Sequence, residues 1–200
     1  MFRYYFLLLL SLFLLSPLLA NFGGGKKKHS KAKKMYKGYI ITLKGDTVKG
    51  KIEMLSPSLN EVKVKLISND GVAVLYRAKE ITAYAFLVPD FDPKEKRFND
   101  KWISYVKKKV ERPPVPFGPT EILMQQDIYG AISFYNYFIE TRSQVIDFEH
   151  LTLLEKDGKM IEVVKTNYKS VLKEMMADRP ILAKKIGKKG YRFKNLKNLI

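Results

Sequence analysis

The sequence predicts a mainly β protein of the α+β class, in which an antiparallel sheet of hairpins, barrel-like or sandwich-like, is capped by two or three short helices. Strand-length runs rich in β-branched and aromatic residues recur between residues 36 and 164, separated by Gly, Asn and Asp turn signals. Apolar residues at helical spacing occur after residue 165. We therefore divide the chain into a signal peptide (1–20), a flexible basic leader (21–35), an antiparallel β domain (36–164) and a helical cap (165–200).

The first twenty residues follow the plan of a secretory signal peptide. One arginine precedes a leucine-rich run from Phe6 to Leu15, and Ala20 offers a small residue for cleavage. The run is short for a membrane-spanning helix. We expect cleavage after Ala20 and export to the periplasm or the cell surface. A retained anchor is the alternative, because Leu18 occupies a position usually held by a small residue.

The leader holds three consecutive glycines followed by a lysine-rich run. Such a segment cannot bury apolar surface, so we expect a solvated linker. Contact with anionic lipid headgroups or with polyanions is the alternative role.

The first predicted hairpin spans Gly38 to Met54, with Gly45 and Asp46 as a two-residue turn. That turn places Leu43 opposite Val48, Ile41 opposite Gly50 and Tyr39 opposite Ile52, all on one apolar face. Gly50 on this face indicates a bend or a close approach of neighbouring backbone.

Further turn signals organise the rest of the β domain, at Asp70-Gly71, Gly130 and Asp157-Gly158. Residues 89–100 are predicted to be a loop. Lys107 to Lys109 end a predicted strand, where they are suited to guard an exposed sheet edge. The predicted strands are 61–68, 72–77, 82–88, 102–110, the two runs that flank Tyr129-Gly130, and the hairpin of 148–154 with 160–164.

Two stretches of the β domain each allow two interpretations. Arg112 to Pro119 is proline-rich and is predicted to connect two sheet sections stiffly; a proline-rich ligand segment is the alternative. The aromatic run Phe134 to Phe138 is predicted to lie on the two faces of a central strand; a stacking surface for a sugar or a base is the alternative.

In the helical cap, Asn167 is the predicted N-cap of a helix over 168–177, and Pro180 opens a second helix over 181–186 that Gly187 ends. A basic, partly apolar stretch follows. It is predicted to lie over a sheet edge, and contact with lipid or nucleic acid is the alternative. Its candidate anion contacts are Lys184, Lys185, Lys188, Lys189 and Arg192.

Composition and motifs exclude several kinds of site. The chain has no cysteine, which excludes disulfides, a thiolate metal site and a lipid-modified cysteine at the N-terminus. His29 and His150 are isolated and form no metal motif. No nucleophile elbow, zinc-protease helix or phosphate-binding glycine loop is present, so we predict no catalytic residue, no cofactor and no metal. The net charge of +17 favours acidic surroundings or partners.

Four stretches of the chain resemble a family of uncharacterised exported proteins of Bacteroidota: GYIITLKGDTVKGKI, AKEITAYAF, EILMQQDIYGAISFYNYF and NYKSVLKEMMADRPILAKKI. The family has a cysteine in its last segment in many members, and this chain has none. The resemblance implies export and this fold, and it implies no reaction. The matching positions are Gly45, Asp46, Thr47, Gly50, Gly130, Asp178 and Pro180.

Three functions compete at this point. A non-enzymatic binding or scaffold module of the cell envelope, with an envelope protein or a glycan as partner, ranks first. A polyanion-binding protein ranks second, with weak, non-specific contacts to anionic polysaccharide, membrane surface or nucleic acid that salt would abolish. A hydrolase with carboxylates brought together by folding ranks third, with Asp127, Asp147 and Glu149 as its candidates.

Overall fold

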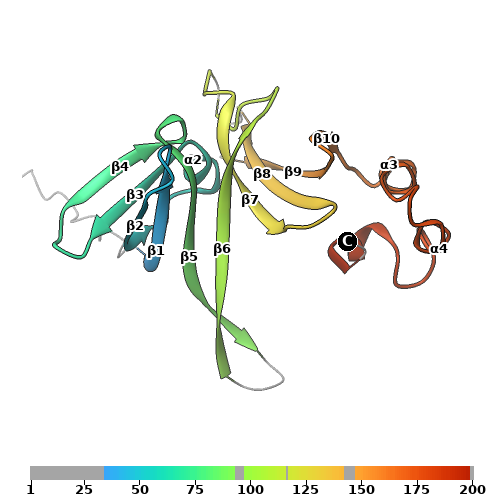
Figure 1. Cartoon of the computed structure of the whole chain (residues 1–200), viewed down its shortest axis with the longest axis horizontal. Coiled ribbons are helices and arrows are strands. Elements are labelled where there is room, and N and C mark those ends of the chain that lie inside the picture. The colour runs from blue at the N-terminus through green and yellow to red at the C-terminus, as the bar shows by residue number, and fades with distance from the viewer. Residues whose placement is uncertain (1–33, 93–96, 116, 142–146, 199–200) are drawn as a thin grey trace, which may run out of the picture. The chain divides into compact units, whose positions relative to one another are not determined.

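The computed structural model describes residues 34–92, 97–115, 117–141 and 147–198. These residues form one antiparallel sheet of ten strands and a few short helices (Figure 1). The predicted mainly β fold with a helical C-terminal segment is confirmed. In chain order the elements are β1 (Met35–Thr42), β2 (Thr47–Glu53), α2 (Pro57–Val62), β3 (Lys63–Ser68), β4 (Ala73–Arg77), η1 (Ala78–Glu80), β5 (Ile81–Asp92), β6 (Arg97–Lys109), β7 (Glu121–Ile128), β8 (Ser133–Thr141), β9 (Asp147–Lys156), β10 (Lys159–Glu162), α3 (Tyr168–Met175), α4 (Pro180–Ala183) and η2 (Phe193–Asn198).

The strand order across the sheet is β10-β9-β8-β7-β6-β5-β1-β2-β3-β4. Neighbours in the sheet are mostly neighbours in the chain, except that β1 lies between β5 and β2. Within the described residues β4 and β10 do not pair, so the sheet is not closed into a barrel.

The predicted signal peptide and nearly all of the predicted leader lie outside the described residues. The end of the predicted leader belongs to the sheet instead. Met35 begins β1, and the carbonyl oxygen of Lys34 accepts a hydrogen bond from the N–H of Met54 at 2.9 Å.

The first hairpin turns through three residues, not two. The N–H of Thr42 donates to the carbonyl of Asp46 at 2.9 Å, and the N–H of Gly45 donates to the carbonyl of Thr42 at 3.1 Å. Gly45 has φ +90°, a left-handed conformation that glycine adopts without steric cost. Leu43 to Gly45 therefore form a three-residue loop with glycine at its last position.

This longer loop makes the predicted register of the first hairpin wrong. Ile40 lies opposite Val48, and Gly38 lies opposite Gly50. The change moves the even-numbered side chains of β1 to the core face. Ile40 is fully buried, whereas Leu43 is 56% exposed at the turn.

A helix that the sequence did not predict follows β2. Pro57 begins α2 between the predicted first hairpin and the predicted strand 61–68, since proline fits the first turn of a helix. The next strand consequently starts at Lys63 and not at Glu61. The helix packs against β7 and β8 as well as β3, and the hydroxyl of Tyr84 in β5 donates to the carbonyl of Asn60 at 2.8 Å.

The centre of the sheet also differs from expectation. β5 continues to Asp92 and β6 begins at Arg97, so most of the predicted 89–100 loop is strand (Figure 1). β6 is an interior strand, and its Lys107 to Lys109 pair with Glu121 to Leu123 of β7, so the prediction that they guard an exposed edge is wrong. The proline-rich stretch joins β6 to its neighbour β7 and does not connect separate sheet sections.

The C-terminal segment contains the two predicted helices, and each of them is shorter than predicted. Asn167 precedes α3 but does not cap it with its side chain. Its Oδ1 accepts from the N–H of Val164 at 2.8 Å, and its Nδ2 donates to the carbonyl of Glu162 at 3.0 Å. Asn167 thus fastens the chain between β10 and α3. The helix α4 ends at Ala183, before the left-handed Gly187 (φ +89°).

Three buried clusters hold the sheet together. One contains Ile40 and Tyr84 from the face of β1–β5 on which α2 lies. A second joins Phe134 and Leu154 of β8 and β9 to the helical segment. The third includes Tyr135 on the opposite face of β6–β9. The burial of the aromatic run in β8 supports its interpretation as core.

Candidate functional site: a basic cleft beside α2

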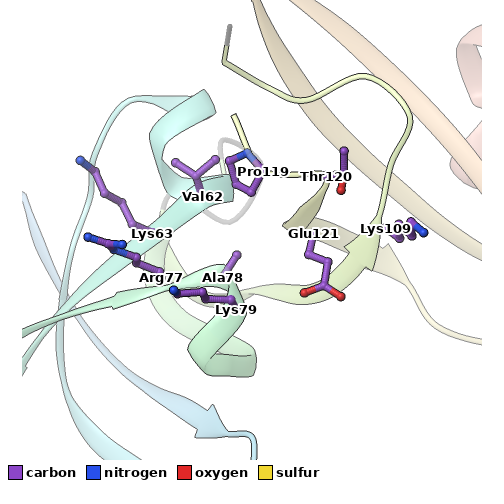
Figure 2. Close-up of a pocket in the computed structure, with 9 residues that line it drawn as sticks. All are labelled: Val62, Lys63, Arg77, Ala78, Lys79, Lys109, Pro119, Thr120 and Glu121. Carbon is purple, nitrogen blue, oxygen red and sulfur yellow. The ribbon is translucent and has the colours of Figure 1, made fainter. Parts of the chain in front are cut away.

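A cleft of about 690 Å³ lies where the end of α2 and the start of β3 approach η1 and the β6–β7 connection (Figure 2). Chain segments that are far apart in sequence meet there because α2 packs against β7 and β8 as well as β3. The lining residues are Val62, Lys63, Arg77, Ala78, Lys79, Lys109, Pro119, Thr120 and Glu121.

Two cross-strand pairs flank the cleft. Lys63 lies directly opposite Arg77 in the β3–β4 ladder, and Lys109 lies directly opposite Glu121 in the β6–β7 ladder. Figure 2 shows the first pair on one side of the cleft and the second pair on the other, with apolar lining residues between them. The apolar lining consists of Val62, Ala78 and Pro119.

The charged side chains of the cleft are mostly positive. Four of its nine lining side chains are cationic and one is a carboxylate. Ion pairs neutralise other cations of the fold, such as Lys108 with Glu155 at 2.6 Å. Within the described residues, none of the four cleft cations is in an ion pair. Like charges directly opposite each other in an antiparallel pair are destabilising, and Lys63 and Arg77 form such a pair at this edge. Glu80 accepts the backbone N–H of Arg77 at 2.8 Å but forms no ion pair with the guanidinium.

The lining of the cleft combines cations with an apolar surface. The lining residues include no histidine, and Thr120 supplies their one hydroxyl. A hydroxyl needs an adjacent general base to act as a nucleophile, and the Thr120 hydroxyl forms no hydrogen bond to a His, Asp or Glu side chain of the described residues. The described residues contain no group of His, Asp and Glu that could hold a metal ion. An apolar surface beside several cations is instead suited to an anion that carries an apolar part.

The structure places the predicted anion contacts of the helical cap elsewhere. All five are exposed, and none of them lines the cleft. One of them lies near an aromatic ring, since Lys185 Nζ is 5.7 Å from the ring centroid of Tyr191. The five residues are Lys184, Lys185, Lys188, Lys189 and Arg192.

The residues predicted to form turns shape the backbone at separate places, and they do not gather in one site. Gly71 ends a three-residue loop like the one that Gly45 ends. Asp157 and Gly158 form a two-residue hairpin loop, and both have the positive φ that a type I′ turn requires. Gly50 lies inside β2. Asp46, Asp70 and Gly130 lie at or beside the chain turns.

Of the carboxylates considered for a hydrolase, Asp127 and Glu149 are not brought together. Asp127 accepts hydrogen bonds from Gln125 at 2.7 Å and from Asn136, and it pairs with Lys197. Glu149 pairs with Arg112 at 2.6 Å. By strand alternation Glu149 lies on the face opposite to that of Asp127 and its partner Asn136. The side chain of Asp147 lies outside the described residues.

A second cavity of about 600 Å³ lies between β8–β9 and the C-terminal segment. Its lining includes Phe134, Val163 and Leu196, which belong to the buried cluster of the helical cap. Glu162 and three lysines, Lys165, Lys194 and Lys197, also line it. Lys197 pairs with Asp127, so among the described residues this cavity has fewer cations outside ion pairs than the basic cleft.

The cleft escaped prediction because its cations are dispersed along the chain. Lys63, Arg77, Lys79 and Lys109 belong to different elements, and none belongs to the basic leader or the helical cap. The sequence offered one indication of the cleft, namely two cations at the ends of one predicted hairpin. Lys63 and Arg77 both stand at the ends of a hairpin whose Asp70-Gly71 turn is readable in the sequence.

Comparison of the chain with protein-family models, with curated proteins and with solved structures finds no match. The resemblance to exported proteins of Bacteroidota stays a prediction. No helix in the part of the chain that the structure describes is long and apolar enough to cross a membrane.

Proposed function

We propose that this chain is an exported, non-enzymatic binding module of the cell envelope, and that its basic cleft holds an anionic ligand with an apolar part. The observation that carries the proposal is the unneutralised pair Lys63–Arg77 beside the apolar surface of Val62, Ala78 and Pro119. An anionic group bound there would relieve the repulsion between the two cations.

The two cations of this pair, Lys63 and Arg77, have complementary properties. The guanidinium of Arg77 can bind a carboxylate or a phosphate with two parallel hydrogen bonds, and the ammonium of Lys63 adds a mobile positive charge. An acyl chain or another apolar group would lie against Val62 and Pro119, where its burial adds to the binding free energy. The proposed export rests on the signal-like start of the sequence.

A calorimetric titration with sodium dodecanoate below its micelle concentration tests the proposal. Dodecyl maltoside, which has the same chain length on an uncharged headgroup, is the control ligand. We expect the wild type to bind dodecanoate more tightly than dodecyl maltoside. The double variant Lys63→Gln/Arg77→Gln should lose about tenfold or more in affinity, because hydrogen bonds to charged groups contribute about 1.5–3 kcal/mol.

The matched control removes two exposed cations of the helical cap, Lys184→Gln/Lys185→Gln, and should bind like the wild type. Equal affinities of the two double variants for dodecanoate would contradict the cleft as the binding site. Equal binding of dodecanoate and dodecyl maltoside would contradict an anionic ligand.

A further inference from the structure

A second surface with binding chemistry lies on the sheet face away from α2. Side chains alternate along a strand, so Tyr39 in β1 points away from the buried Ile40. Tyr39 lies opposite Ala85 in β5, and Trp102 in β6 lies opposite Leu87. These four residues therefore share one face of three adjacent strands.

Two aromatic rings dominate this face. The ring centroids of Tyr39 and Trp102 are 5.6 Å apart, and the ring planes are tilted by 53°. Ala85 is buried on the same face, which indicates that larger neighbours cover it. Trp102 nevertheless remains 51% exposed. The rings are thus held in place by the sheet while one of them stays available to a ligand.

Three exposed lysines adjoin the rings. Lys49 lies directly opposite Tyr39, and Lys37 lies directly opposite Lys51, all on the same face. In the portion of the chain described, none of these lysines is in an ion pair. The carboxylate of Glu53, next along this face of β2, pairs with Lys65 at 2.9 Å. The lysines beside the rings therefore carry a positive charge that a ligand can neutralise.

We infer that this surface, made by Tyr39, Trp102, Lys37, Lys49 and Lys51, binds an anionic polysaccharide. The apolar face of a sugar ring packs flat on an exposed aromatic ring while its hydroxyls stay in water, and the indole N–H is a further hydrogen-bond donor. Carboxylates or sulfates of neighbouring sugars pair with the lysines. The rings of Tyr39 and Trp102 are tilted by 53°, so they do not form the parallel platform on which successive bases of a single strand stack, which favours a glycan.

This surface shares no residue with the lining of the basic cleft. Its ligand and that of the cleft are therefore testable separately. The inference stands whether or not the cleft binds dodecanoate.

The emission of Trp102 provides a direct test, because it is the only tryptophan of the chain. We expect polygalacturonate to change this emission saturably, uncharged dextran to leave it unchanged, and oligothymidylate to bind more weakly than polygalacturonate. The variant Lys49→Gln/Lys51→Gln should bind polygalacturonate about tenfold or more weakly. The matched variant Lys188→Gln/Lys189→Gln and the cleft variant Lys63→Gln/Arg77→Gln should bind it like the wild type.

A calorimetric titration of Trp102→Ala, checked for folding by circular dichroism, gives a second readout and should show the same weakening. Binding of polygalacturonate with unchanged Trp102 emission would overturn the inference, since contact would lie elsewhere. An equal loss of affinity in the Lys188→Gln/Lys189→Gln variant would show that polygalacturonate responds only to the overall charge, and would overturn the inference. Tighter binding of oligothymidylate than of polygalacturonate would make the surface a nucleic-acid site and overturn the glycan assignment.

Discussion

Gly38 and Gly50 lie directly opposite each other in β1 and β2, and neither position has room for a side chain. A Cβ atom at Gly50 would lie 2.3 Å from the carbonyl oxygen of Ile67, and one at Gly38 would lie 2.4 Å from the carbonyl oxygen of Ala85. The backbones of β1, β2, β3 and β5 therefore approach closely here, where a side chain would collide with main-chain atoms that cannot move independently.

Gly50→Val should consequently destabilise the fold by about 1–3 kcal/mol, the usual cost of overpacking, or more because the obstruction is backbone. The urea midpoint of unfolding measures the effect. Gly130→Ala is the control, since a Cβ there would meet only the carbonyl oxygen of Ile132 at 3.9 Å. An unchanged midpoint for Gly50→Val would contradict the packing of β2 against β3.

Glu61 of α2 should make the stability depend on pH. Its Oε1 accepts the N–H of Phe138 at 2.7 Å, and its Oε2 is buried without a hydrogen-bond partner. Burial raises the pKa of this carboxyl to about 8 from a usual value near 4.5, although the Phe138 N–H acts to lower it. Between these two pH values the folded protein keeps a proton that the unfolded chain releases. The contribution of Glu61 to the free energy of unfolding is therefore full below pH 4.5 and is lost as the pH rises to about 8.

Glu61→Gln should remove this pH dependence, because an amide does not titrate and can still accept the N–H of Phe138. Unfolding free energies of both proteins, measured across this pH range, should diverge in favour of Glu61→Gln as the pH rises. The divergence should be measurable, because a pKa that differs by one between the folded and the unfolded protein corresponds to about 1.36 kcal/mol. Two parallel pH profiles would contradict a protonated carboxyl in the folded protein.

The hydroxyl of Tyr84 fastens α2 to the sheet through the carbonyl of Asn60. Tyr84→Phe keeps the ring, including its stacking on Tyr105 at 4.5 Å between centroids, and removes this hydrogen bond. A loss of about 1–3 kcal/mol is expected, because a buried carbonyl is left without a donor. Thermal unfolding compares it with Tyr129→Phe, a ring that is 86% exposed and should be insensitive to the change. Equal melting temperatures of the two variants would contradict this anchoring role.

The first hairpin shows how far a sequence determines local structure. Gly45 was assignable to a turn because few other residues adopt its positive φ. The loop length was not assignable, because Gly45 serves equally as the first residue of a two-residue loop or the last of a three-residue loop. Because the loop has one residue more than predicted, the side chains of β1 that were expected on the core face lie on the other face, and Leu43 lies exposed in the turn.

The helix α2 and the basic cleft were not predictable for a different reason. Val62, Val64 and Leu66 alternate as in a strand, and the short helix has too few residues to show a helical period. Contacts from distant elements, such as the Phe138 N–H to Glu61, hold these residues in place. Lys109 likewise reaches the cleft only through the β6–β7 pairing, which no local pattern specifies.

The proposed export makes a prediction about the start of the mature chain. Protein isolated from its native host should begin near Asn21 and should be found outside the cytoplasm, since Ala20 is the expected cleavage site. N-terminal sequencing after cell fractionation measures both. A cytoplasmic protein that retains Met1 would contradict export and would leave the cleft proposal to be tested by itself.

Mapping of backbone amide shifts on addition of dodecanoate tests the central claim most directly, because it locates the ligand without relying on variants. Amides lining the basic cleft, among them Lys63, Ala78 and Thr120, should shift saturably with dodecanoate and less with dodecyl maltoside. Shifts confined to the helical cap around Lys184 to Arg192, or the absence of saturable shifts at the cleft, would contradict a ligand site beside α2.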